Sequence, residues 1–368
     1  MSQPAIKGLH HITLCASGAQ DDLDFLTQVL GLRLIKQTVL FDGRYAHYHL
    51  YYANANADIG SVLTTFPYRR IAGRPGAGQI SSTAFAVPKG SLSFWSDHLS
   101  RHAVDHSEAQ ERFGQSFIRL RHPSGLLMEV IEDADDTRAG WTTGEIGADV
   151  AARGFHGPVL SVRETAEQER FFVEALGFRK TGTDGAYHRF EVGTGGAGKT
   201  LVLHHEPDRA TGSWGFGAGT GHHLALDIGT DEALAEQKNL YEELGYTDCS
   251  EIKDRNYFHS IYVRSPGGIL TECAASVPEG FARDEPIDQL GMQLLLPPWF
   301  EHRREEIVAM LEPIVVPEHN RPATMAAAAG PGGAAQARKE TEASAASGVT
   351  PSRRTSATFI GGDVPPQA

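Results

Sequence analysis

The chain has 368 residues, a formal net charge of −13 and three cysteines (Cys15, Cys249 and Cys273) with no CxxC spacing. The length suffices for about two domains, the acidity and the lack of a Lys/Arg run argue against a nucleic-acid partner, and the cysteines exclude a disulfide framework or a zinc ribbon. No run reaches about 18 apolar residues and no leader segment is recognisable. We therefore expect a cytoplasmic protein without a membrane partner.

Recurring segments divide the chain into four modules. Gly8–Leu14 resembles Gly221–Leu226, and Pro123–Glu129 shares its spacing with Pro266–Glu272. The modules start near Gly8, Gln79, Gly154 and Gly221. Each predicts a strand, an amphipathic helix and three further strands, so the fold class is α+β with four βαβββ modules.

The helices and middle strands repeat their own signatures in chain order. A glycine follows the last apolar residue of three helices, where a left-handed C-cap favours a residue without Cβ; these are Gly31, Gly177 and Gly245. Module 2 is the most diverged, and its helix is predicted near 93–102. An aromatic–His pair recurs on the middle strands at Tyr48-His49, Tyr187-His188 and Phe258-His259.

One segment imitates a nucleotide site. Gly193–Thr200 fits the pattern GxxxxGK[ST], but phosphate binding requires a helix after the loop. Leu201–Leu203 is instead a short apolar strand followed by His204-His205-Glu206-Pro207. We predict a hairpin loop.

The repeat stops after Ser276. A helix from His302 to Leu311 is predicted to pack against the modules, and from Arg321 the composition shifts to Ala, Gly, Ser, Thr and Pro, which predicts disorder. The expected divisions are 5–140 for modules 1 and 2, 150–276 for modules 3 and 4, 277–320 for a C-terminal extension, and 321–368 for the tail.

Residues with metal-ligand chemistry survive at only some repeat positions. Because side chains alternate along a strand, His223 and Glu272 of module 4 can both point into a cup, and His11 and Thr13 do so in module 1 by the same count. At the position of the glutamate, module 1 has Thr65. At the position of the histidine, module 2 has Ser82 or its neighbour and module 3 has Gly157. Glu129 is interpreted as structural because its module lacks the histidine.

The set that remains is His11, His223 and Glu272. Two imidazoles and one carboxylate form the facial triad of non-haem Fe(II) oxygen chemistry. A single strand histidine is more often a satisfied structural residue, so the hypothesis rests on the repeated position and the matching glutamate. Mn(II) is an alternative, since it accepts the same ligands.

Three dense segments carry a family resemblance: GLHHITLCAS at 8–17, LIKQTVLFDG at 34–43 and KDRNYFHSIY at 253–262. From about residue 6 to 276 the chain resembles the vicinal oxygen chelate superfamily, and within it the hydroquinone ring-cleaving dioxygenases. The resemblance implies two cupped mixed β-sheet barrels, a small aromatic para-diol substrate, O2 and Fe(II). It places the iron ligands at His11, His223 and Glu272, and the active-site neighbours at His10, Thr13, His222, Arg255 and Tyr262.

The roles of these neighbours stay open at this point. Tyr262 and Arg255 are candidates for substrate positioning and proton handling, against a scaffold tyrosine and a surface salt bridge. By strict alternation His10 and His222 face away from the ligands and would act behind them, whereas Thr13 faces inward. A glyoxalase-type isomerase and a non-catalytic binding protein are the alternative functions; Thr65, where an isomerase would need a further carboxylate, disfavours the first. The assembly of identical chains is left open.

Overall fold

The computed structural model describes residues 5–40, 47–215 and 217–320, so the tail predicted from Arg321 lies outside the described residues. Each module follows the predicted order of elements. Module 1 contains β1 (Gly8–Ala16), α1 (Ala19–Asp24), the π-helix η1 (Phe25–Val29), β2 (Arg33–Val39), β3 (Tyr48–Ala53) and β4 (Val62–Pro67). Module 2 contains β5 (Gln79–Val87), α2 (Leu92–Arg101), β6 (Gln110–Arg112), β7 (Gln115–Arg121) and β8 (Leu127–Glu132).

The second half repeats this plan and adds an extension. Module 3 contains β9 (Gly154–Val162), α3 (Ala166–Arg170), the π-helix η2 (Phe171–Ala175), β10 (Arg179–Asp184), β11 (Tyr187–Glu191) and β12 (Thr200–His205). Module 4 contains β13 (Thr220–Asp227), α4 (Asp231–Glu243), β14 (Lys253–Asp254), β15 (Phe258–Arg264) and β16 (Leu270–Ser276). The extension has 3-10 turns at Gly280–Ala282, Pro298–Arg303 and Glu318–Asn320, and α5 (Arg304–Met310).

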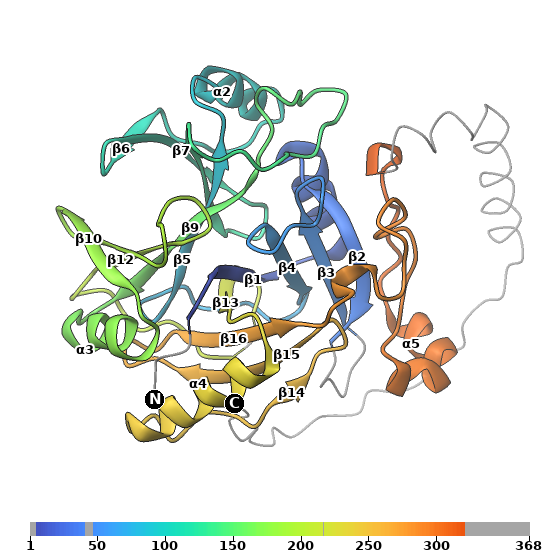
Figure 1. Cartoon of the computed structure of the whole chain (residues 1–368). Helices are drawn as coiled ribbons and strands as arrows, with labels where there is room; N and C mark the ends of the chain where they lie inside the picture. Colours follow the sequence, from blue (N-terminus) through green and yellow to red (C-terminus); the bar gives the residue numbers. More distant parts are fainter. Residues whose placement is uncertain (1–4, 41–46, 216, 321–368) are drawn as a thin grey trace, which may run out of the picture.

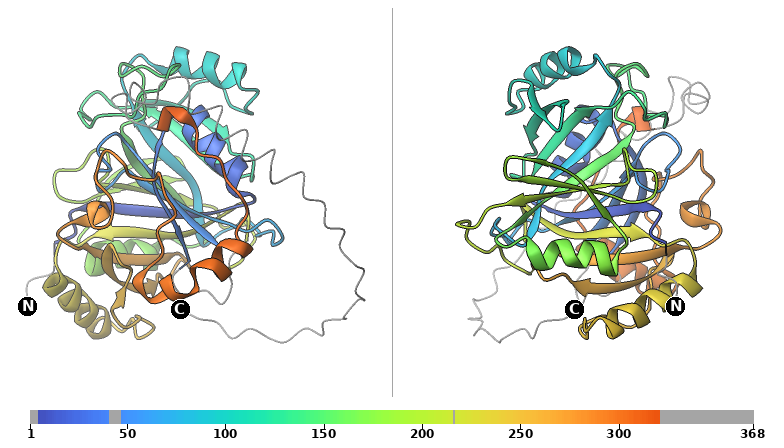
Figure 2. Two further views of the ribbon diagram at one scale, coloured as in Figure 1. Left: turned by 90° about the vertical axis from the view of Figure 1, so that its right-hand side faces the viewer. Right: turned by 60° about the vertical axis from the view of Figure 1, so that its left-hand side comes forward.

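Two eight-stranded sheets form the molecule, in the orders β14-β15-β16-β13-β1-β4-β3-β2 and β10-β11-β12-β9-β5-β8-β7-β6. Within a module the first and last strands pair in parallel, and the modules join through the antiparallel pairs β1–β13 and β5–β9. Both sheets curl, with the helices outside them (Figures 1 and 2). The predicted α+β fold with cupped mixed sheets is confirmed.

The sheets do not follow the order of the modules along the chain. Modules 1 and 4 build the first sheet, and modules 2 and 3 build the second. Each sheet therefore takes one module from 5–140 and one from 150–276, and these ranges remain a predicted division of the chain.

Apolar side chains on the outer faces of the strands anchor the helices. The main core joins residues of the central strands of the first sheet with those of the first helix, namely Leu9, Ile12, Leu14, Leu224 and Leu226 with Leu23, Leu26 and Leu30. Burying such faces is the principal stabilisation of the fold. Because these strand faces pack against the helix, the opposite faces of the same strands line the interior of the cup.

Every first strand carries one extra residue where it meets its partner module. The ladder between β1 and β13 skips His10 on one side and His222 on the other, and the ladder between β5 and β9 skips Ser81 and His156. A β-bulge of this kind interrupts the alternation of side chains and bends the strand. The four bulges occupy matching repeat positions.

The glycine-based predictions are confirmed. Gly31, Gly177 and Gly245 have φ of 69°, 71° and 88°, the left-handed conformation of a helix C-cap. The segment Gly193–Thr200 leads into strand β12 and not into a helix, as expected of a hairpin loop. Among the helices of the described segments, none has the length and apolar character needed to cross a membrane.

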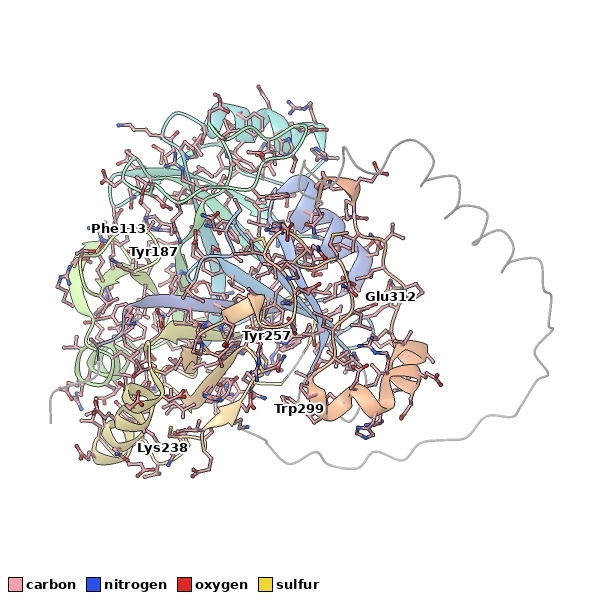
Figure 3. The ribbon with its side chains drawn as sticks, turned by 45° about the vertical axis from the view of Figure 1, so that its right-hand side comes forward. Phe113, Tyr187, Lys238, Tyr257, Trp299 and Glu312 are labelled. Carbon is pink, nitrogen blue, oxygen red and sulfur yellow. The ribbon has the colours of Figure 1, made fainter. Side chains whose placement is uncertain are left out.

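The extension packs on the edge of the first sheet. Ile307 of α5 clusters with Val39 and Leu296, which confirms the predicted packing, although the first part of the predicted helix is a 3-10 turn. Asn320 binds both backbone groups of Leu34, at 2.7 and 3.0 Å. Glu312 on this extension, which is labelled in Figure 3, forms an ion pair with Arg69.

Candidate metal centre and active site

Three sequence-predicted ligands meet inside the first cup. His11 comes from β1, His223 from β13 and Glu272 from β16, with exposed fractions of 2%, 5% and 0%. The two Nε2 atoms are 3.0 Å apart, and Glu272 Oε2 lies 2.9 Å from His223 Nε2 and 3.3 Å from His11 Nε2. One atom from each residue thus faces a common point.

These separations fit a divalent metal ion. Two donors that each lie about 2.1 Å from an ion, at right angles to each other, are about 3.0 Å apart. Among the described residues, neither Glu272 oxygen accepts a hydrogen bond in good geometry. Burial by itself would raise the pKa of Glu272, but the neighbouring His11 and His223 outweigh it and hold the pKa well below its usual value. The carboxylate is thus buried, charged and oriented toward two imidazoles.

A second pair of histidines supports the first. His10 Nδ1 lies 2.9 Å from His11 Nδ1, and His222 Nδ1 lies 2.6 Å from His223 Nδ1. If Nε2 of each ligand is free to bind a metal, its Nδ1 carries the proton and donates to the supporting histidine. His10 then carries its own proton on Nε2, which lies 2.9 Å from Ser276 Oγ.

The expectation that His10 and His222 point away from the ligands is wrong. Both are the extra residues of the bulges, so each shares the cup side with the ligand that follows it. Burial, followed by the charge of His11, lowers the pKa of His10 to about 3. Burial and His223 lower the pKa of His222 well below its usual value. Both rings are therefore neutral and able to accept a hydrogen bond.

Tyr262 and Arg255 lie beside the ligands. Tyr262 pairs with Glu272 across β15 and β16, and its ring packs edge-on to His223 with centroids 5.7 Å apart. Arg255 Nε donates to the Tyr262 hydroxyl at 3.2 Å, and its guanidinium lies 5.2 Å from that ring. Burial and Glu272 raise the pKa of Tyr262 far above its usual value, so the phenol keeps its proton.

A chain of hydrogen bonds that was not predicted runs from the ligands into the sheet. Thr13 Oγ1 lies 2.8 Å from His223 Nε2 and 2.7 Å from Thr64 Oγ1. Thr64 Oγ1 lies 3.0 Å from His49 Nε2, and His49 Nδ1 lies 3.1 Å from the Tyr51 hydroxyl. The recurring aromatic–His pair, here Tyr48-His49, is the sequence signal that could have pointed to His49, but it was used only to align the modules.

The repeat position matching Glu272 is Thr64, not Thr65. Glu272 pairs with Ala225, two residues after His223, and Thr64 pairs with Thr13, two residues after His11. Thr65 faces the helix side instead, where its hydroxyl donates to Asp22 at 2.5 Å. A shift of one residue along a strand moves a side chain to the opposite face of the sheet. Neither Thr64 nor Thr65 is a carboxylate, so module 1 lacks one at either position.

The second cup has different chemistry. Ser82 and Gly157 stand at the positions that match the ligand histidines. Glu129 is completely buried and pairs with Arg112 at 2.6 Å and Arg119 at 2.8 Å. Burial would raise the pKa of Glu129, but the two guanidinium groups lower it below its usual value. This pairing supports the interpretation of Glu129 as a structural residue.

Comparison with known proteins finds close relatives. The chain is 41% identical over 316 residues to the chlorohydroquinone/hydroquinone 1,2-dioxygenase of Sphingobium indicum, which covers 84% of this chain and 98% of that protein. A crystal structure of a Bacillus subtilis protein named "putative dioxygenase" is 35% identical, with a TM-score of 0.80 over 86% of this chain and 100% of that one. No protein-family model matches the chain.

A more distant likeness concerns the fold alone. Glyoxalase I from Zea mays superposes with a TM-score of 0.53 at 14% identity, over 73% of this chain and 92% of that one. The curled sheets are thus shared by proteins of different chemistry. The assignment of the chain to a family depends on the relatives with higher sequence identity.

Proposed function

Because this chain belongs to the family of extradiol-type ring-cleaving dioxygenases with the vicinal oxygen chelate fold, we propose that it opens substituted hydroquinone rings with O2 and that its metal is Fe(II). The ligands would be His11, His223 and Glu272. The observation that carries the proposal is the set of three buried donor atoms 2.9 to 3.3 Å apart. The name of the Sphingobium relative supports the substrate class.

When bound, Fe(II) would supply a Lewis acid for one phenolic hydroxyl and a redox partner for O2. The two nitrogens and one oxygen would leave room on the ion for these two reactants. Mn(II) would fit the same donors. The overall reaction inserts both atoms of O2 into the ring-opened product.

The protein has to place the second hydroxyl of the substrate. The two hydroxyls of a para-diol lie on opposite sides of the ring, so only one of them can reach the metal. Tyr262 keeps its proton and receives a hydrogen bond from Arg255. We assign this pair to orienting the ring and donating a proton to oxygen.

His10 and His222 would hold the imidazoles of His11 and His223 in one tautomer and one orientation. On the opposite side, the hydroxyls of Thr13 and Thr64 connect the ligand layer to His49. Burial and the nearby His11, His223 and Arg255 lower the pKa of His49 well below its usual value, so its ring stays neutral. We propose that His49 orients the hydroxyl of Thr64 and, through it, the hydroxyl of Thr13 beside His223.

The alternative of a glyoxalase-type isomerase is disfavoured because Thr64 stands where a further carboxylate would be needed. The decisive experiment loads the protein anaerobically with Fe(II), determines bound metal, and measures O2 uptake with hydroquinones and catechols. We expect one O2 consumed per hydroquinone opened. Iron-loaded protein that consumes no O2 with any hydroquinone would refute the proposal.

A further inference from the structure

A second group of metal-ligand residues lies outside the two cups. His98 and His102 are one turn apart near the C-terminal end of α2, and Glu145 comes from the segment between β8 and β9. Glu145 Oε2 lies 3.1 Å from His102 Nε2 and 3.6 Å from His98 Nδ1. Helix α2 is at the top of Figure 1, on the outside of the second sheet. We propose that these three side chains bind a zinc ion.

His98 is prepared for this role by its other nitrogen. His98 Nε2 lies 2.9 Å from the carbonyl oxygen of Val29, and the side chain is completely buried. A carbonyl oxygen can only accept, so Nε2 carries the proton and Nδ1 presents its lone pair toward Glu145 and His102. Metal-binding histidines are commonly oriented by this type of contact.

The other two ligands leave access from solvent. The side chains of His102 and Glu145 are 28% and 57% exposed. The donor set of two imidazoles and one carboxylate is common for zinc, with water as the fourth ligand. An ion could therefore enter without a movement of the backbone.

Arg101 opposes the ion. Its Nη2 lies 3.4 Å from His98 Nδ1, near the limit for a hydrogen bond, and its positive charge repels a cation. Because Arg101 is exposed, the guanidinium can swing into water when zinc arrives. Removing this side chain should therefore strengthen zinc binding.

The ion would connect three segments. His98 lies in α2 and His102 caps its C-terminal end. Glu145 belongs to the segment that also receives the Trp95 indole hydrogen bond through Val150 at 3.0 Å, and His98 contacts Val29, which ends the helix of module 1. Zinc at this place would stabilise the contact between modules 1 and 2. It would take no part in the reaction.

The test titrates zinc into the chelator-treated full-length chain and counts bound ions with a competing chromogenic chelator. His102→Ala and Glu145→Gln should each weaken one zinc site about 10-fold or more. The rise in melting temperature that zinc causes in the wild type should be reduced in both variants. Both substitutions are at accessible positions and avoid the buried His98.

Two further variants sharpen the result. His188→Ala removes a partly buried histidine that lies 2.5 Å from Glu169, and it should leave the number of zinc sites unchanged. Arg101→Ala should bind zinc more tightly. The proposal is overturned if His102→Ala binds zinc with the same number and affinity as the wild type, or if Arg101→Ala binds it more weakly. Iron content and O2 uptake of the same variants report separately on the catalytic centre.

Discussion

The Nε2 atoms of His11 and His223 lie 3.0 Å apart although the two residues are 212 positions apart in the chain. The antiparallel pair β1–β13 makes this possible, since it sets Thr13 opposite His223 and His11 opposite Ala225. The proposed metal centre thus lies at the junction of the first and fourth modules. Its integrity depends on the pairing of those modules.

Iron should be required and removable. We expect about one Fe(II) bound to His11, His223 and Glu272 per chain, loss of O2 uptake after treatment with a chelator, and recovery when Fe(II) and a reductant are added. Metal analysis before and after treatment gives the stoichiometry. Full turnover of metal-free protein would contradict the assignment.

Glu272→Gln should lose iron and activity, whereas Glu129→Gln should keep iron. A neutral amide binds a dication more weakly than a carboxylate does. Glu129 belongs to an arginine pair in the other cup, and removing one partner of a buried ion pair costs on the order of 3–5 kcal/mol of stability. Iron content and urea unfolding of both variants separate the two effects. Equal loss of iron in both would mean that the second cup contributes to the site.

Tyr262→Phe should slow turnover about 10²–10⁴-fold at equal iron content, the usual effect of losing a positioned acid or base. The aromatic ring would remain and could keep its packing against His223. The assay measures O2 uptake and ring-opened product with chlorinated or methylated hydroquinone and with catechol. Wild-type rates in the Phe variant would make Tyr262 a scaffold residue, and faster cleavage of catechol would refute the substrate class.

His49→Phe should reduce turnover by up to about 10²-fold while iron stays bound, because it removes the hydrogen bond that orients Thr64 and Thr13. His188→Phe is the matched control, since His188 occupies the same repeat position in module 3 and pairs with Glu169. His188→Phe should leave turnover unchanged. Equal rates in both variants would exclude a positioning role for His49.

Acid should destabilise the protein partly through Glu129. Burial by itself would raise the pKa of Glu129, but the larger opposite effect of Arg112 and Arg119 lowers it. The pKa in the folded state therefore lies below the value in the unfolded state. The ionised Glu129 contributes its full stabilisation of the fold above the pKa of an unfolded glutamate, about 4.3. This stabilisation is lost as the pH falls through the pKa of the folded state. The free energy of unfolding should therefore fall more steeply below about pH 4.3 in the wild type than in Glu129→Gln. Urea titrations along a pH series measure this, and parallel curves would contradict the expectation.

The sequence by itself determined the repeating plan and the choice of candidate ligand residues. The recurrence of a His-His pair on first strands and of the Pro-x-Gly-x-x-x-Glu frame predicted four modules, and the uneven retention of His and Glu selected His11, His223 and Glu272. The glycines after the helices and the strand after Gly193–Thr200 were also predictable. Such features depend on neighbours along the chain, where periodicity and capping act.

Only the tertiary structure decided how the strands align. The bulges that bring His10 and His222 to the ligand side, and the register that makes Thr64 the counterpart of Glu272, depend on hydrogen bonds between strands far apart in the chain. The contact of His49 with Thr64 depends on the same pairing. A shift of one residue in such a ladder exchanges the faces of a strand, and the local pattern of the segment contains no signal for it. The residues of the candidate site were thus predictable from the chain, whereas their orientation was set by long-range pairing.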